Sequence, residues 1–82
     1  MGCGPLSQAE ADEAYRRIQV AEARVAHGLA AVERCEPGSA CPASEEVCAG
    51  ADEVCRQAQR VHEADARERC EAARRSCAGV ER

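Results

Sequence analysis

The sequence contains no Trp, Phe or Lys, and Tyr15 is its one aromatic residue. Because large aromatic side chains supply much of the buried area in small domains, any core here is thin and built from Ala, Val and Cys. All basic residues are Arg, and the net charge is −4. Without a basic patch interleaved with aromatic residues, nucleic-acid binding is disfavoured. No apolar run approaches the roughly 20 residues that a membrane-spanning helix needs.

Cysteine is the residue that the sequence has in excess, with seven among 82 residues. A chain this short buries little apolar surface, and short cysteine-rich chains are typically held together by disulfides formed in an oxidising compartment. The composition therefore predicts a single exported domain over residues 7–82, preceded by a flexible tether over residues 1–6. No signal peptide is visible, so export implies that one has been removed.

Residues 7–35 are predicted to form the first helix. Ser7 followed by Glu10 has the spacing of a capping box, in which each residue satisfies a backbone amide of the other. Small or apolar residues then recur at steps of three and four on one helical face; they are Ala14, Ile18, Ala21, Val25, Gly28, Val32 and Cys35. Gly28 costs roughly 1 kcal/mol relative to alanine in a helix, and a close helix crossing would explain it. Because this face is predicted to be buried, Val25→Asp is expected to destabilise the fold by several kcal/mol.

The stretch from Glu36 to Pro42 contains two prolines, a glycine and a serine, which ends this helix. A second helix is predicted over residues 44–61, with Ser44 as its N-cap and two glutamates in its first turn. Its apolar stripe consists of Val47, Ala51, Val54, Ala58 and Val61. Cys48 and Cys55 each follow a stripe residue by one position, so they point sideways, toward a third helix.

The third helix is predicted over residues 65–80, with Asp65 as its N-cap and Glu68 completing a second capping box. The turn before it contains neither Gly nor Pro. One long helix from Ser44 to Ala78 is therefore the alternative, and the cysteine spacing decides between the two.

Four cysteines form two equally spaced pairs, Cys48 with Cys55 and Cys70 with Cys77. In antiparallel helices, facing residues have position numbers with a constant sum, and Cys48 with Cys77 and Cys55 with Cys70 meet this condition. Cysteines seven apart on one helix are about 10 Å apart along its axis, whereas bridged Cβ atoms lie about 4 Å apart, so one long helix could not bridge its own cysteines. The predicted fold is therefore all-α, a three-helix bundle containing a disulfide-stapled antiparallel helical hairpin.

This hairpin resembles the helical hairpins with twin Cys-x(n)-Cys motifs known from small mitochondrial intermembrane-space proteins. The resemblance covers residues 48–77 and departs from the family in spacing, because only six residues separate the cysteines of each pair here. It implies the architecture of two cross-linked antiparallel helices. It does not carry over an import pathway or an activity.

The remaining cysteines are Cys35, Cys41 and Cys3. Cys35 and Cys41 are predicted to form a third disulfide across the loop between the first two helices. The Gly2–Cys3 junction resembles the end of a bacterial lipoprotein signal. The resemblance implies an exported protein of the bacterial periplasm or cell envelope, anchored to a membrane through a lipidated Cys3. The alternative is a free or dimer-forming thiol in a flexible tail. N-myristoylation is disfavoured, because its pattern requires Ser or Thr where Leu6 stands.

Metal binding is the sharpest competing hypothesis, because reduced cysteines along helices hold soft cations such as Cu(I) in bacterial copper-storage bundles. The sequence lacks their Cys-x-x-x-Cys spacing and also the Cys-x-x-Cys spacing of zinc ribbons. The candidate ligands for Cu(I) or Zn(II) are Cys55, His62 and Cys70. The leading expectation is that no cofactor is bound, that His62 lies in a solvated turn and that His27 lies on the surface.

No feature of the sequence identifies a reaction. There is no Gly-rich phosphate loop, and cysteines held in disulfides supply no activated thiolate for nucleophilic catalysis. The prediction is a non-enzymatic structural or interaction domain that presents charged helix faces to an unknown protein partner or to a second copy. The alternatives are a soft-metal binder and a secreted inhibitor or toxin-like scaffold.

Overall fold

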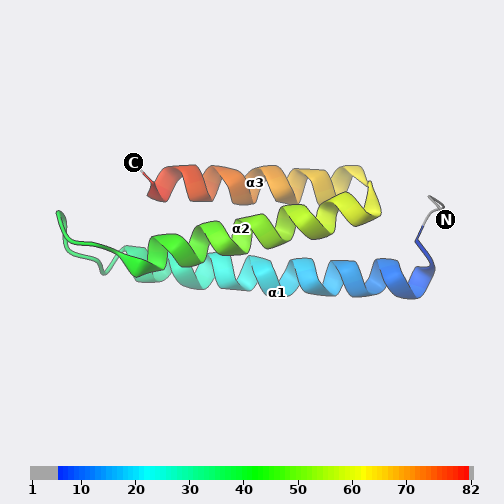
Figure 1. Ribbon diagram of the computed structural model, residues 1–82, viewed down its shortest axis with the longest axis horizontal. Helices are drawn as coiled ribbons and strands as arrows, with labels where there is room; N and C mark the ends of the chain where they lie inside the picture. The colour runs from blue at the N-terminus through cyan, green and yellow to red at the C-terminus, as the bar shows by residue number, and fades with distance from the viewer. Residues whose placement is uncertain (1–5, 82) are drawn as a thin grey trace.

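The computed structural model describes residues 6–81 and contains three helices: α1 (Gln8–Val32), α2 (Pro42–Val61) and α3 (Ala64–Val80). Figure 1 shows them side by side, with α2 antiparallel to both of the others. The predicted all-α three-helix fold with a cross-linked hairpin is confirmed. The molecule measures 49 × 21 × 18 Å. The start of α1 lies at the same end as the α2–α3 turn, and the α1–α2 linker lies at the opposite end (Figure 1).

The helix starts follow the sequence prediction only for α1. Ser7 Oγ accepts the Glu10 amide at 3.1 Å and Glu10 Oε1 accepts the Ser7 amide at 3.0 Å, which is the predicted capping box. The prediction of Ser44 as N-cap of α2 is wrong, because the helix starts earlier, at Pro42, with Cys41 as its N-cap. Proline is favoured in the first helical turn, where its missing amide leaves no hydrogen bond unmade.

The prediction of Asp65 as N-cap of α3, with Glu68 completing a capping box, is also wrong. The N-cap is Glu63, and its side chain makes no capping hydrogen bond. The Glu63 carboxylate instead accepts a hydrogen bond from Tyr15. Helix α1 ends at Val32, before the predicted end at Cys35. The amides of Arg34 and Cys35 donate to carbonyls only three residues back, which marks tight turns at the start of the linker.

The α2–α3 turn depends on His62. Its backbone adopts the left-handed conformation, with φ 54° and ψ 38°, and its amide hydrogen-bonds to the Ala58 carbonyl. Histidine is among the residues that tolerate this conformation better than most. The helix is therefore broken without Gly or Pro, and the single long helix is excluded.

The α1–α2 linker contains a β-turn from Glu36 to Ser39. Pro37 and Gly38 occupy its central positions, Gly38 has φ 83°, and the Ser39 amide donates to the Glu36 carbonyl at 3.2 Å. These are the residues that a type II turn requires. Residues 36–40 are all exposed, so the linker is ordered by its own turn and not by packing on the helices.

The core consists of small side chains from the predicted stripes, and its largest fully buried members are Ile18, Val47 and Val54. The buried hydrophobic residues are Ala14, Ile18, Ala21, Val25, Val47, Ala51, Val54, Cys55, Ala58, Ala66 and Ala73. Helix α2 packs extensively on both other helices, whereas α1 and α3 touch each other much less. None of the helices within residues 6–81 is long and apolar enough to cross a membrane.

Two glycines bring α1 and α2 into close contact. A Cβ placed on Gly28 would lie 2.7 Å from Val47 Cγ2, and a Cβ placed on Gly50 would lie 2.7 Å from Val25 Cγ2. Each glycine therefore receives a valine from the facing helix. The close crossing expected at Gly28 is present, and Gly50 is its counterpart, which the sequence reading missed.

Gly28→Ala is expected to lower the free energy of unfolding by up to about 2 kcal/mol. The helix gains about 1 kcal/mol from alanine, but overpacking costs about 1–3 kcal/mol. Backbone atoms 3.2 and 3.3 Å from the new Cβ, in Val47 and Ala43, offer no easy relief. Gly79→Ala is the matched control, because nothing lies within 4 Å of its Cβ position. Urea unfolding should show Gly79→Ala unchanged or stabilised, and equal effects at both sites would contradict the close crossing.

Candidate functional site

The predicted cysteine positions come together as three disulfides. The outer disulfide, Cys48–Cys77, and the inner disulfide, Cys55–Cys70, both join α2 to α3, with Cα–Cα separations of 4.7 and 4.6 Å. The linker disulfide, Cys35–Cys41, closes the loop between α1 and α2 with a Cα–Cα separation of 5.8 Å. The two hairpin pairs are those that the spacing predicts, and the third is the predicted bridge across the linker.

No disulfide ties α1 to the hairpin, because α1 itself contains no cysteine. The hairpin of α2 and α3 is therefore cross-linked twice, while α1 is held on it by packing and polar contacts. Cys55 is buried, and the other five paired cysteines are half-buried.

The alternative metal ligands Cys55, His62 and Cys70 line one shallow depression beside the α2–α3 turn. The two sulfurs are bonded to each other in the inner disulfide, so they offer no thiolates. His62 is exposed, as is His27 on α1. This set therefore has no metal-binding capacity in the oxidised chain.

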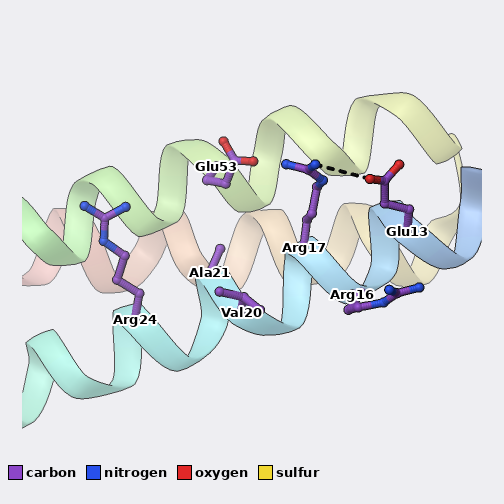
Figure 2. Close-up of a pocket in the computed structure, with 7 residues that line it drawn as sticks. All are labelled: Glu13, Arg16, Arg17, Val20, Ala21, Arg24 and Glu53. Carbon is purple, nitrogen blue, oxygen red and sulfur yellow. Dashed lines mark hydrogen bonds and ion pairs between the residues drawn. The ribbon is translucent and has the colours of Figure 1, made fainter.

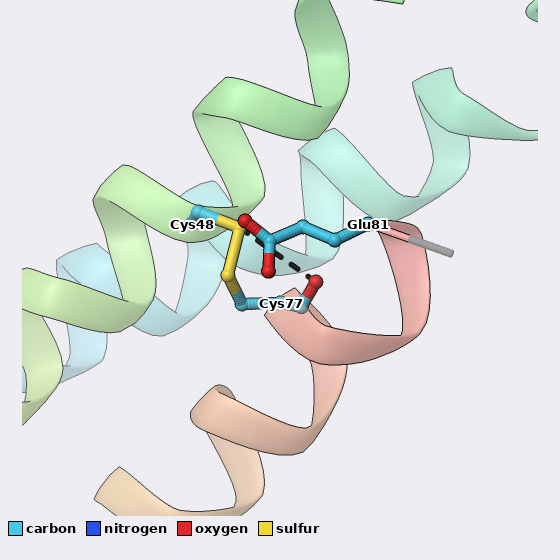
Figure 3. Close-up of side chains that lie close together, drawn as sticks. All are labelled: Cys48, Cys77 and Glu81. Carbon is cyan, nitrogen blue, oxygen red and sulfur yellow. Dashed lines mark hydrogen bonds between the residues drawn. A yellow bond between two sulfur atoms is a disulfide. The ribbon is translucent and has the colours of Figure 1, made fainter.

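A different acidic side chain lies beside the outer disulfide. One carboxylate oxygen of Glu81 and the sulfurs of Cys48 and Cys77 all lie within 4.8 Å of one another. Figure 3 shows the Glu81 carboxylate reaching back from the end of α3 to the bonded sulfurs. The sequence reading missed this residue, although its spacing of four from Cys77 places it on the same face of α3.

A depression with a volume of about 360 Å³ lies along α1 and α2 around Val20. Val20 is 67 % exposed and is the one exposed large hydrophobic side chain within residues 6–81. Figure 2 shows Val20 between arginines of α1, with Glu53 on the facing helix. The arginines are Arg16, Arg17 and Arg24.

Most charges around this depression are already paired. Arg17 lies 3.2 Å from Glu13, and Arg24 lies 2.7 Å from Glu46, whose pKa the hydrogen bond from Arg24 lowers. We name Val20 with Arg16, Arg17 and Arg24 the Val20 surface. The sequence could have indicated this surface, because Val20 lies off the apolar stripe and has arginines three and four residues away.

Polar side chains join α1 to α3. The Tyr15 hydroxyl donates a hydrogen bond of 2.7 Å to Glu63 Oε1. Arg69 of α3 lies 3.1 Å from Glu22 and 3.1 Å from Asp65, with its guanidinium carbon 5.8 Å from the centre of the Tyr15 ring. Because α1 and α3 otherwise touch little, these contacts fix how α1 sits against α3.

The hydrogen bond to Glu63, reinforced by burial and nearby carboxylates, raises the pKa of Tyr15 from 10.0 to about 12. The folded state thus favours the protonated phenol, so this stabilisation is fully present below pH 10 and is lost as the pH rises toward 12. Near-ultraviolet absorbance reports the titration cleanly, because Tyr15 is the one tyrosine and there is no Trp. Glu63→Gln keeps an acceptor but removes the charge, so it should return the pKa toward 10. A wild-type midpoint near 10 would contradict the contact.

Comparison of the chain with protein-family models, curated proteins and solved structures finds no match. The function must therefore be inferred from the chain's own chemistry. The predicted lipidation site, Cys3, and most of the predicted tether lie outside the described residues.

Proposed function

We propose that the protein is an exported, non-enzymatic domain that serves as a rigid structural or interaction module of a bacterial cell envelope. The observation that carries the proposal is the state of the cysteines. All six that lie within residues 6–81 are joined in intramolecular disulfides. Such a set of bonds persists in oxidising compartments and is rare where thiol reductants are abundant.

The surface supports an interaction role better than catalysis. The paired cysteines provide no nucleophile. At the Val20 surface, Arg17 and Arg24 are already occupied in ion pairs with Glu13 and Glu46. A surface on which charged side chains surround one exposed apolar side chain suits contact with a protein partner or with a second copy of the chain. We propose the Val20 surface as that contact.

Lipidation of Cys3 would bring one end of the molecule close to the membrane. Cys3 precedes the start of α1 by five positions. An anchor there would hold the start of α1 and the α2–α3 turn near the membrane. The linker turn at residues 36–40 would then lie at the far end of the 49 Å long axis.

Cell fractionation tests export and anchoring together. Expressed from its own gene, the protein should be found in a membrane fraction, oxidised, with lipid on Cys3. Cys3→Ser should abolish the lipid modification, with the three disulfides still formed. A cytosolic protein with reduced cysteines would contradict the proposal.

A further inference from the structure

The outer and inner disulfides are matched in backbone geometry but differ in their surroundings. Both join α2 to α3 with nearly equal Cα–Cα separations, 4.7 and 4.6 Å. Only the outer pair, Cys48 and Cys77, has a third group of the kind that ligates metals within 4.8 Å of both sulfurs, and this group is the Glu81 carboxylate. It is the one such trio found within residues 6–81.

The fold places Glu81 over the sulfurs. Glu81 is the C-cap of α3, and its amide hydrogen-bonds to the Cys77 carbonyl at 3.2 Å. This bond continues the helical geometry past Val80, so the Glu81 side chain lies one turn beyond Cys77 on the same face. Figure 3 shows the carboxylate lying beside the Cys48–Cys77 bond. Glu81 is itself exposed, and the two cysteines are half-buried.

We propose that Cys48, Cys77 and Glu81 bind one Zn(II) ion when the outer disulfide is reduced. A dithiol reductant supplies two electrons and two protons to the S–S bond, giving two thiols, and is itself oxidised to a disulfide. Zinc binding then displaces both thiol protons. Two thiolates and one carboxylate, with water in the fourth position, form a tetrahedral set for this borderline-soft ion.

The backbone of the hairpin already suits this ligand set. With Zn–S bonds of about 2.3 Å, two thiolates on one tetrahedral ion lie about 3.8 Å apart. Cα atoms 4.7 Å apart allow that separation after rotation of the two side chains, without movement of the helices. The inner disulfide lies closer to the α2–α3 turn and keeps the hairpin closed while the outer one is open. The metal site thus falls at the outer pair, and not at Cys55, His62 and Cys70.

The test uses the full chain with Cys3, Cys35 and Cys41 replaced by Ser, so that only the outer and inner pairs remain. Limited reduction should open the outer pair first, because Cys55 of the inner pair is buried. Alkylation and peptide mass identify which pair is open. Co(II) is the probe, since thiolate-to-cobalt charge transfer reports sulfur ligation, and Zn(II) competition gives the zinc affinity.

One Co(II) per chain is expected, bound through two thiolates, with the helical circular dichroism retained. Glu81→Gln should weaken binding by about tenfold or more, because loss of a direct ligand costs at least as much as loss of a ligand's hydrogen-bond partner. The converse chain, with Cys48→Ser and Cys77→Ser and a reduced inner pair, should bind more weakly than the outer pair.

The proposal would be overturned by unchanged affinity in Glu81→Gln, by equal binding at the inner pair, or by absence of binding. Loss of helix on opening the outer disulfide would also overturn it, because the proposal requires the hairpin to hold both thiols in place. The proposal does not rest on export. Failure of metal binding leaves the fractionation result unaffected, and the reverse also holds.

Discussion

Val25→Asp is expected to lower the free energy of unfolding by about 3–5 kcal/mol, because it buries an unpaired carboxylate in the contact between α1 and α2. Val25 is 6 % exposed and packs over Gly50. Arg69 lines the same depression as Val25, but it already pairs with Glu22 and Asp65. A domain of 82 residues has a total stability of about 4–12 kcal/mol, so the loss is a large share of it.

The effect should be confined largely to α1. Since both hairpin disulfides remain, circular dichroism of Val25→Asp during urea unfolding should show the 25 residues of α1 losing their helix first, with α2 and α3 retained. Val20→Asp is the matched control, because the same change is made at a side chain that is 67 % exposed. It should change stability by about 0.5 kcal/mol at most. Equal effects of the two substitutions on the free energy of unfolding would contradict the packing of α1 on the hairpin through Val25.

In a chain whose outer disulfide is already removed with Cys48→Ala and Cys77→Ala, removing the inner disulfide with Cys55→Ala and Cys70→Ala is expected to cost about 3 kcal/mol. This is the chain-entropy value for an isolated loop of about 15 residues. The cross-linked residues are 15 apart in sequence. The Cys55 side chain is also part of the core, so its truncation adds a small loss of packing. Urea unfolding under non-reducing conditions measures the change.

The linker disulfide provides the comparison for this prediction. Cys35 and Cys41 are only six apart, so their removal should cost about 1 kcal/mol less by the same dependence on loop length. An inner disulfide that matters no more than the linker disulfide would mean that the unfolded chain gains little freedom when the hairpin is opened.

The architecture could be predicted because two independent periodicities agree. Residues on the apolar stripe of α1, such as Ile18 and Val25, are buried where the steps of three and four place them. The equal spacing of the cysteine pairs then selects the hairpin over one long helix. Both signals depend on helix geometry alone, so they do not require knowledge of how the side chains contact one another.

The caps and the polar contacts could not be predicted in the same way. Ser44 and Asp65 are residues that favour N-caps, but tertiary context moved both helix starts. Helix α2 begins two residues earlier, at Pro42. Helix α3 has Glu63 as its N-cap, and the Glu63 carboxylate accepts a hydrogen bond from Tyr15 of α1. Contacts between helices depend on rotation and register that one sequence does not state. A close helix crossing at Gly28 could be inferred from the sequence, but the second close contact, at Gly50, could not.

Peptide mapping under non-reducing conditions tests the cross-linked hairpin most directly. Free thiols are first alkylated, and the chain is then cut after Arg and Glu at acidic pH, where disulfides do not exchange. Glu53 separates the two cysteines of α2, giving peptides 47–53 and 54–56. The structure predicts 47–53 joined to 76–81, and 54–56 joined to 70–71. Any exchange of these partners, or alkylated cysteines in these four peptides, would contradict it.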